Sequence, residues 1–190
     1  MRAPMRAALV ALALATALTG VATEAAPSPA AGIVAGHYDL VRSDGTRVTE
    51  RSFPGRWQLV FFGFTNCPDI CPTTLLSVRH ALDELGPLGT NIEPVFITLD
   101  PARDTPEKLR DYLHGFGPTF VGLTGTEADV REAARAFRVY LEVRALSEDS
   151  YTVDHSAFLY LLDPDGHFVQ LLSGDAPGHQ LADTLREALH

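Results

Sequence analysis

The sequence has few sulfur-containing residues and a deficit of positive charge. Its 190 residues include 2 cysteines and 2 methionines, and 15 Lys and Arg stand against 24 Asp and Glu, for a formal net charge of −9. An acidic chain of this kind is not expected to bind nucleic acid, whereas its surface can attract cations or basic protein patches. No internal repeat or low-complexity tract appears, and the length suits one well-cored domain with little chain left for a second.

The chain also lacks an uncharged run of the roughly 20 residues that span a membrane. Arg2 and Arg6 precede Ala7–Ala22, an uncharged stretch rich in Ala and Leu that is about 16 residues long. We therefore expect residues 1–26 to be a cleaved signal peptide, with an uncleaved anchor as the alternative. Export would place the protein in the bacterial periplasm or on the outer face of the cytoplasmic membrane, where conditions are oxidising.

Cysteine is absent near the candidate cleavage points at Ala22, Ala25 and Ala26, so no lipid-anchored N-terminus is expected. Residues 27–32 are small and include proline, which is typical of a linker. The remaining residues, 33–190, are expected to form the folded domain.

The two cysteines lie in a stretch that predicts a strand, a loop and a helix in succession. Leu59–Phe62 is a continuous apolar run of the kind that forms a strand buried on both faces. Cys67 and Cys71 follow in a loop, and Pro72 suits the first turn of a helix because its missing N–H would be unpaired there anyway. Both sulfurs are thus expected near a helix N-terminus, whose partial positive charge favours the thiolate form.

The remaining pattern predicts an α/β protein with a thioredoxin-like fold: a mixed central sheet flanked by helices, with an N-terminal β-hairpin. The hairpin is expected from two short strands on either side of the turn Ser43–Gly45. Thr105 and Thr126 each mark a helix start, since threonine caps the free N–H groups of a first helical turn. Further strands are predicted over residues 95–99, 119–123, 139–143, 151–153, 156–162 and 167–172, and a last helix carries Leu181, Leu185 and Leu189.

Cysteines four positions apart are close enough to form a disulfide or to bind one metal ion together. A disulfide across so short a loop constrains the unfolded chain little, so stability is a weak reason for the pair. Thioredoxin-type redox motifs have two intervening residues, whereas three separate Cys67 from Cys71. Two thiolates are soft ligands that select copper(I) or zinc. The cysteine pattern alone supports metal binding and redox chemistry equally.

His155 is the candidate for a third ligand among the seven histidines. It stands beside Asp154 at the mouth of an apolar strand, where a side chain can face the loops at the sheet edge. Most of the other histidines fall in or next to helices and turns, where an ordinary surface position is expected. A metal site would use His155, whereas a redox pair of cysteines would not need it.

Four blocks of the chain carry a resemblance to a known family. They are FGFTNCPDICPTT at 62–74, FITLDPARDTP at 96–106, GLTGT at 122–126 and YTVDHS at 151–156. In order and spacing these blocks resemble the Sco/SenC family of copper-binding assembly factors for cytochrome c oxidase, and the likeness spans nearly the whole domain. The first and last blocks are specific to that family, whereas thioredoxins and peroxiredoxins share only the general layout of a strand and a cysteine loop.

The resemblance implies that Cys67, Cys71 and His155 are metal ligands and that the metal is copper(I), copper(II) or both. Asp154 is then interpreted as the partner that orients the His155 ring, with a strand-end cap as the alternative. In an oxidising compartment the metal-free protein is expected to form an intramolecular Cys67–Cys71 disulfide.

The implied function is that of a metallochaperone, not an enzyme, that delivers copper to the dinuclear copper site of cytochrome c oxidase during its assembly. The alternative is a thiol–disulfide oxidoreductase that uses Cys67 and Cys71 as a redox pair to keep the oxidase copper-site cysteines reduced. Expected partners are the copper-site subunit of the oxidase and other exported copper chaperones or thiol reductases. No nucleic acid partner is expected, and the chain is expected to be a monomer.

Overall fold

The computed structural model describes residues 34–147 and 150–189. The predicted signal peptide or anchor at 1–26 and the predicted linker at 27–32 lie outside the described residues. Within the part of the chain that is described, no helix combines the length and the apolar character that crossing a membrane requires.

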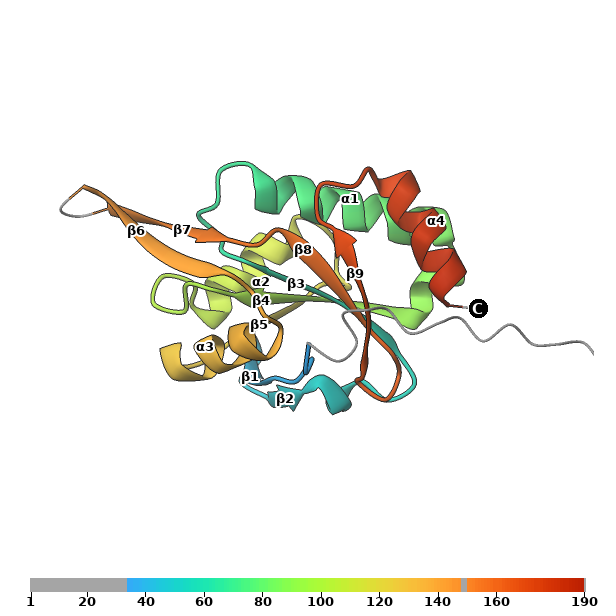
Figure 1. Cartoon of the computed structure of the whole chain (residues 1–190), viewed down its shortest axis with the longest axis horizontal. Helices are drawn as coiled ribbons and strands as arrows, with labels where there is room; N and C mark the ends of the chain where they lie inside the picture. Colours follow the sequence, from blue (N-terminus) through green and yellow to red (C-terminus); the bar gives the residue numbers. More distant parts are fainter. Residues whose placement is uncertain (1–33, 148–149, 190) are drawn as a thin grey trace, which may run out of the picture.

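A mixed sheet forms the centre of the molecule (Figure 1). In the described residues its strands are β1 (Asp39–Arg42), β2 (Arg47–Thr49), β3 (Trp57–Gly63), β4 (Ile92–Thr98), β5 (Val121–Thr124), β8 (Phe158–Leu162) and β9 (Phe168–Ser173). They lie in the order β2-β1-β5-β4-β3-β8-β9, with β3, β4 and β5 parallel and the others antiparallel to their neighbours. The predicted N-terminal hairpin is confirmed as β1 and β2, and β1 joins it to the sheet through β5.

Helices cover both faces of this sheet (Figure 1). Helices α1 (Ile70–Leu85), α2 (Pro106–His114) and α4 (Gly178–Ala188) contribute to one apolar cluster, whereas α3 (Glu127–Ala136) contributes to the cluster on the opposite face. Short 3-10 helices, η2 (Glu50–Ser52) and η3 (Gly89–Asn91), precede β3 and β4. The result is the predicted thioredoxin-like α/β fold, with the carboxyl end of β3 leading directly into α1.

The central strand β3 supplies both layers of the core by alternation. Leu59 and Phe61 pack with α1, α2 and α4, whereas Val60 and Phe62 pack on the side of α3. All four side chains are at most 2% exposed. The continuous apolar run is therefore a strand covered on both faces, as the sequence predicted.

The predicted helix starts are confirmed by their caps. The Thr105 hydroxyl accepts a hydrogen bond from the Lys108 N–H at 3.3 Å, and the Thr126 hydroxyl accepts one from the Asp129 N–H at 3.2 Å. Some predicted ends are wrong by about two residues, since β5 begins at Val121 and β8 begins at Phe158. Such shifts are ordinary, because the end of an element depends on its partners as well as on its own residues.

A second, two-stranded sheet stands apart from the first. Its strands, β6 (Leu141–Ser147) and β7 (Ser150–His155), pair antiparallel with each other and project from the body of the molecule (Figure 1). The strands predicted at 139–143 and 151–153 therefore belong to a longer hairpin outside the main sheet. Val153 is buried in the core at the root of this hairpin, whereas most of β6 is exposed.

Candidate metal centre

Both cysteines lie where the carboxyl end of β3 turns into α1. The chain leaves β3 at Gly63, turns through 65–67 and enters α1 at Ile70. Both described cysteines are free thiols: Cys71 is buried in the first turn of the helix, and Cys67 is half-buried just before it. The Cys71 N–H donates to Cys67 Sγ over 3.4 Å. A free N–H at the start of the helix thus faces a sulfur, as the sequence predicted.

Gly63 lets the Cys71 sulfur approach the backbone of β3. A Cβ atom added to Gly63 would lie 2.8 Å from Cys71 Sγ and 3.0 Å from the Phe96 ring. Both distances are shorter than van der Waals contact, so glycine is needed here for space. A larger residue would displace either the sulfur or the strand.

His155, the last residue of β7, brings its ring to the same place from 84 residues further along the chain. Its Nε2 atom lies 3.8 Å from Cys71 Sγ, and its Nδ1 atom lies 2.9 Å from the Ser156 carbonyl oxygen. Because a carbonyl oxygen only accepts hydrogen bonds, Nδ1 carries the proton and Nε2 presents its lone pair toward Cys71. The rings of Phe61 and Phe64 stand edge-on to the imidazole and restrict its rotation.

Asp154 does not orient His155, contrary to the interpretation from sequence. Successive side chains of a strand point to opposite faces, and the Asp154 carboxylate lies 3.1 Å from the Arg144 guanidinium on β6. The Ser156 carbonyl oxygen takes the orienting role instead.

The two thiols differ in their tendency to lose a proton. The pKa of Cys67 is lowered to about 4, chiefly by the hydrogen bond from the Cys71 thiol, with further lowering by the N–H groups of Cys71 and Asp69. The pKa of Cys71 is raised, because its proton is held by the Cys67 sulfur and because the side chain is buried. Cys67 is therefore the thiolate at neutral pH, and Cys71 keeps its proton until a metal ion or a reaction removes it.

Together, Cys67, Cys71 and His155 offer two sulfurs and one imidazole nitrogen. Zinc, which takes the same ligands, forms bonds of about 2.3 Å to sulfur and about 2.0 Å to imidazole nitrogen. The 3.8 Å between Cys71 Sγ and His155 Nε2 is shorter than the sum of these two bonds, so a single ion can contact both atoms. The donor set is soft, which suits copper(I) or zinc.

Reasoning from the sequence missed a buried polar network beneath the thiol loop. Asp100 and Asp104 are buried, although carboxylates are rarely buried without partners. Asp100 accepts hydrogen bonds from the Tyr151 hydroxyl and from Arg103, and Asp104 accepts hydrogen bonds from Thr65 in the thiol loop. The available signal was their place in the loop after β4, since the carboxyl ends of parallel strands are where α/β proteins bind ligands.

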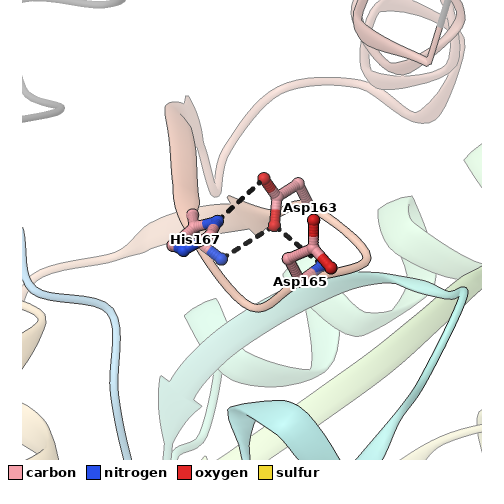
Figure 2. A group of neighbouring side chains, drawn as sticks. All are labelled: Asp163, Asp165 and His167. Carbon is pink, nitrogen blue, oxygen red and sulfur yellow. Dashed lines mark hydrogen bonds and ion pairs between the residues drawn. The ribbon is translucent and has the colours of Figure 1, made fainter.

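A second group of potential ligands lies at the opposite end of the sheet. Figure 2 shows Asp163, Asp165 and His167 in the turn between β8 and β9, with one ligand atom from each within 4.8 Å of the others. This end is opposite because Leu162 of β8 pairs with Gln58 near the start of β3, whereas the thiols follow its end. Asp163 Oδ1 accepts hydrogen bonds from the N–H groups of Asp165 at 3.0 Å and His167 at 2.8 Å. These bonds close the turn, in agreement with the interpretation of His167 as an ordinary turn residue.

A family model described as SCO1/SenC matches residues 26–190 of the chain. The protein SCO1 homolog 1, mitochondrial, of Arabidopsis thaliana is 37% identical over 164 residues, which make up 86% of this chain and 49% of that protein. The chain spans about half the length of the curated relatives it matches.

Solved structures of the same family superpose on most of the chain. Copper-bound ScoI of Bradyrhizobium japonicum has a TM-score of 0.74 at 35% identity, covering 81% of this chain and 98% of that chain. Copper-bound yeast Sco1 has a TM-score of 0.75 at 39% identity, covering 81% of this chain and 87% of that chain. In sequence and in fold, as the motif blocks predicted, this chain belongs to the SCO1/SenC family.

Proposed function

We propose that this chain binds copper through Cys67, Cys71 and His155 and delivers it to the copper-site subunit of cytochrome c oxidase during assembly. The observation that carries the proposal is the 3.8 Å contact between Cys71 Sγ and His155 Nε2. A redox pair of cysteines has no need of a nitrogen ligand, whereas a copper site does. The family members with copper bound, at 35% and 39% identity, support the choice of metal, and the N-terminal sequence supports an exported place of action.

The three ligand side chains differ in their protonation state before the ion binds. Cys67, whose pKa is lowered to about 4 by its hydrogen bond with Cys71, meets the ion as a thiolate. Cys71, whose pKa is raised by its hydrogen bond to Cys67 and by burial, releases its proton when it coordinates. His155 keeps its proton on Nδ1 against the Ser156 carbonyl, so Nε2 is free to coordinate. Copper binding at neutral pH therefore releases about one proton.

Delivery requires that ligands of the acceptor reach the ion before the three donors release it. Cys67 is half-buried and Cys71 is buried, so incoming ligands displace Cys67 first. Exposed apolar side chains are close to the ligands in the sequence: Ile70 directly precedes Cys71, and Phe158 follows His155 by three residues. They give an acceptor an apolar rim to contact during the exchange.

A second candidate function, thiol–disulfide exchange, is favoured by the contrast between the two thiols. A half-buried thiolate beside a buried thiol is the arrangement of an attacking and a resolving cysteine. The Cys67 thiolate would attack a substrate disulfide, form a mixed disulfide and release one substrate sulfur as a thiolate. Cys71 would then lose its proton, attack Cys67 Sγ and release the other, so that the substrate gains two electrons and the protein becomes the Cys67–Cys71 disulfide.

Replacement of His155 separates the two functions in the purified protein. His155→Ala keeps both thiols but removes the nitrogen ligand. Copper(II), together with its sulfur-to-copper charge-transfer absorption, should be lost, whereas copper(I) should weaken less because two soft sulfurs can hold that ion. His167→Ala, which removes an exposed histidine at the far end of the sheet, is the matched control and should bind copper as the wild type does.

Oxidase assembly in cells decides which function matters. If the chain is a copper carrier, His155→Ala cells should fail to assemble the oxidase copper site, although the purified variant still reduces a disulfide substrate. Normal assembly in His155→Ala cells, combined with failure in Cys67→Ser and Cys71→Ser cells, would reject the carrier and favour the reductase.

A further inference from the structure

Asp104 is a fully buried carboxylate whose partners lie mainly in the thiol loop. It sits between β4 and α2 and is 0% exposed. Its Oδ2 atom accepts hydrogen bonds from the Thr65 N–H at 2.9 Å and from the Thr98 hydroxyl at 2.7 Å, and its Oδ1 atom accepts one from the Thr65 hydroxyl. Two of these three donors belong to one residue, which stands two positions before Cys67.

Lys108 ties the same loop to α2. Its ammonium group lies 3.4 Å from Asp104 Oδ1 and donates to Asn66 Oδ1 at 2.9 Å and to the Arg103 carbonyl oxygen at 3.3 Å. A buried carboxylate is costly unless such donors surround it. The loop supplies donors to the carboxylate. In return, Asp104 restricts the loop at Thr65, and Lys108 restricts it at Asn66.

The position of Cys67 depends on polar contacts more than that of Cys71 does. Cys71 is buried in a helix, where packing on all sides holds the side chain, whereas Cys67 is half-buried in a turn. Within the turn, the backbone contributes the hydrogen bond from the Cys67 N–H to the Phe64 carbonyl oxygen, at 3.2 Å. The bonds between Thr65 and Asp104 join this turn to the β4–α2 loop, 39 residues away.

We propose that Asp104 is a positioning residue for Cys67: it holds the turn at 65–67 so that the Cys67 sulfur meets an ion held by Cys71 and His155. This inference rests on the proposed copper-binding function. Copper(II) prefers a tetragonal arrangement of donors, whereas copper(I) tolerates fewer donors and varied geometry. Loss of the anchor is therefore expected to weaken copper(II) binding more than copper(I) binding.

Substitutions at the two threonines separate positioning of the turn from plain stabilisation of Asp104. Thr65→Val keeps the shape of the side chain and removes the hydroxyl donor on the turn side of the carboxylate. Thr98→Val removes the hydroxyl donor on the β4 side of the same carboxylate, together with the acceptor of the Asp100 N–H, and is the control for destabilisation away from the turn. Thr65→Ser keeps the hydroxyl and should behave as the wild type does. Asp104→Asn removes the charge itself, and the threonine variants decide the question if this variant does not fold.

Amide hydrogen exchange in the reduced, metal-free protein reports on the turn directly. We expect the Cys67 amide to exchange about tenfold faster in Thr65→Val than in the wild type, and within about twofold of the wild type in Thr98→Val and Thr65→Ser. Equal acceleration in Thr65→Val and Thr98→Val would mean that Asp104 only stabilises the fold, and an unchanged rate in Thr65→Val would mean that it does not hold the turn. Either result overturns the proposal.

Copper(II) binding to the same variants tests the consequence for the sulfur ligand. Thr65→Val should lose copper(II) to a competing chelator about tenfold more readily and should shift the sulfur-to-copper charge-transfer absorption, with copper(I) retention within about twofold. Thr98→Val should keep the wild-type spectrum. Fast exchange with an unchanged spectrum in Thr65→Val would reject the positioning role. If the wild type bound no copper, the copper function would fall, while hydrogen exchange would still decide whether Asp104 holds the turn.

Discussion

The two ends of the central sheet each gather three side chains of metal-binding type, but in opposite ways. At the β8–β9 turn, Asp163, Asp165 and His167 come from five consecutive positions and lie mostly exposed. At the other end, Cys71 meets His155, which lies 84 residues further along the chain, and Cys67 lies beside Cys71. The first group is bound up in hydrogen bonds that close a turn, and the second directs a lone pair at a sulfur.

Local clusters and convergent clusters therefore need different explanations. An aspartate at the start of a hairpin turn accepts backbone N–H groups whether or not an ion is present. The contact between Cys71 and His155 satisfies no backbone group, and it joins α1 to a hairpin that lies outside the main sheet. The contact between Cys71 and His155 is therefore best explained by metal binding, whereas the cluster at the turn is explained by its role in stabilising the turn.

The largest expected effect is the loss of copper when a sulfur is removed from the thiol end. Cys71→Ser replaces a soft ligand with a hydroxyl group that stays protonated, so the copper(I) affinity of the reduced protein should fall at least about a hundredfold. Competition with a chelator measures this affinity. At the turn end, Asp163→Asn combined with His167→Ala should leave copper stoichiometry unchanged. Retention of copper by Cys71→Ser, or its loss from the turn variant, would reverse the ranking of the two ends.

The Cys67 thiol should also be unusually reactive at low pH in the absence of metal. Because the pKa of Cys67 is lowered to about 4, its alkylation rate in the reduced protein should change little between about pH 6 and 8, where an ordinary thiol speeds up about tenfold per pH unit. The rate should fall only as the pH drops toward 4, since protonation then removes the thiolate. Mass spectrometry assigns the modified residue. Faster alkylation of Cys71, or a tenfold slope per pH unit at Cys67, would contradict the assignment.

Each end of the sheet contains a glycine with no room for a side chain, Gly63 at the thiol end and Gly166 at the turn end. Replacing each one tests whether copper binding depends on packing at that end. Gly63→Ala places a Cβ atom 2.8 Å from Cys71 Sγ, so we expect a loss of about 1–3 kcal/mol in the free energy of unfolding and weaker copper(II) binding. Gly166→Ala, at a φ of +84° and with its Cβ 2.8 Å from Glu50, should also destabilise the fold but leave copper binding unchanged. Denaturant unfolding and copper titration of both variants measure the contrast. If both variants lost copper binding in proportion to their loss of stability, the expected difference between the two ends would be contradicted.

The smallest effect is expected at Asp154, which lies beside His155 in sequence but on the other face of the hairpin. Its ion pair with Arg144 is largely exposed, and such pairs contribute about 0–1 kcal/mol. Asp154→Asn should therefore change stability little and leave the copper(II) charge-transfer absorption in place, because the Ser156 carbonyl oxygen orients the ring. A shifted absorption would restore the carboxylate as the orienting group.

Signals within a few residues were enough to predict the elements around the thiols. The apolar run Leu59–Phe62 predicted β3, Pro72 marked the first turn of α1, and Thr105 marked the start of α2. Each of these signals acts through the residue's own backbone or its nearest neighbours. The ligand set could not be predicted in this way. The spacing of the cysteines supports metal binding and redox chemistry equally, and His155 is assigned as a ligand by resemblance to the family.

What could not be predicted depends on contacts between distant segments. The Ser156 carbonyl orients His155, but every residue has a carbonyl group, so the sequence marks none of them for this role. The burial of Asp104 follows from donors on Thr65, 39 residues earlier. The alternating polar and apolar residues of β6 are compatible with any sheet. Only the structure shows that this strand pairs with β7 in a separate sheet.

The distance along the chain between the sulfurs and the imidazole also links copper binding to folding. In an unfolded chain the two sulfurs remain neighbours, whereas His155 is separated from them by a long flexible loop whose closure is entropically unfavourable. In the proposed site, copper(I) held by two sulfurs survives unfolding in part, while copper(II), which depends on the imidazole, binds the native state. A ligand that binds only the native state stabilises it by mass action. The oxidation state of the ion thus sets how far the melting temperature of the protein depends on bound copper.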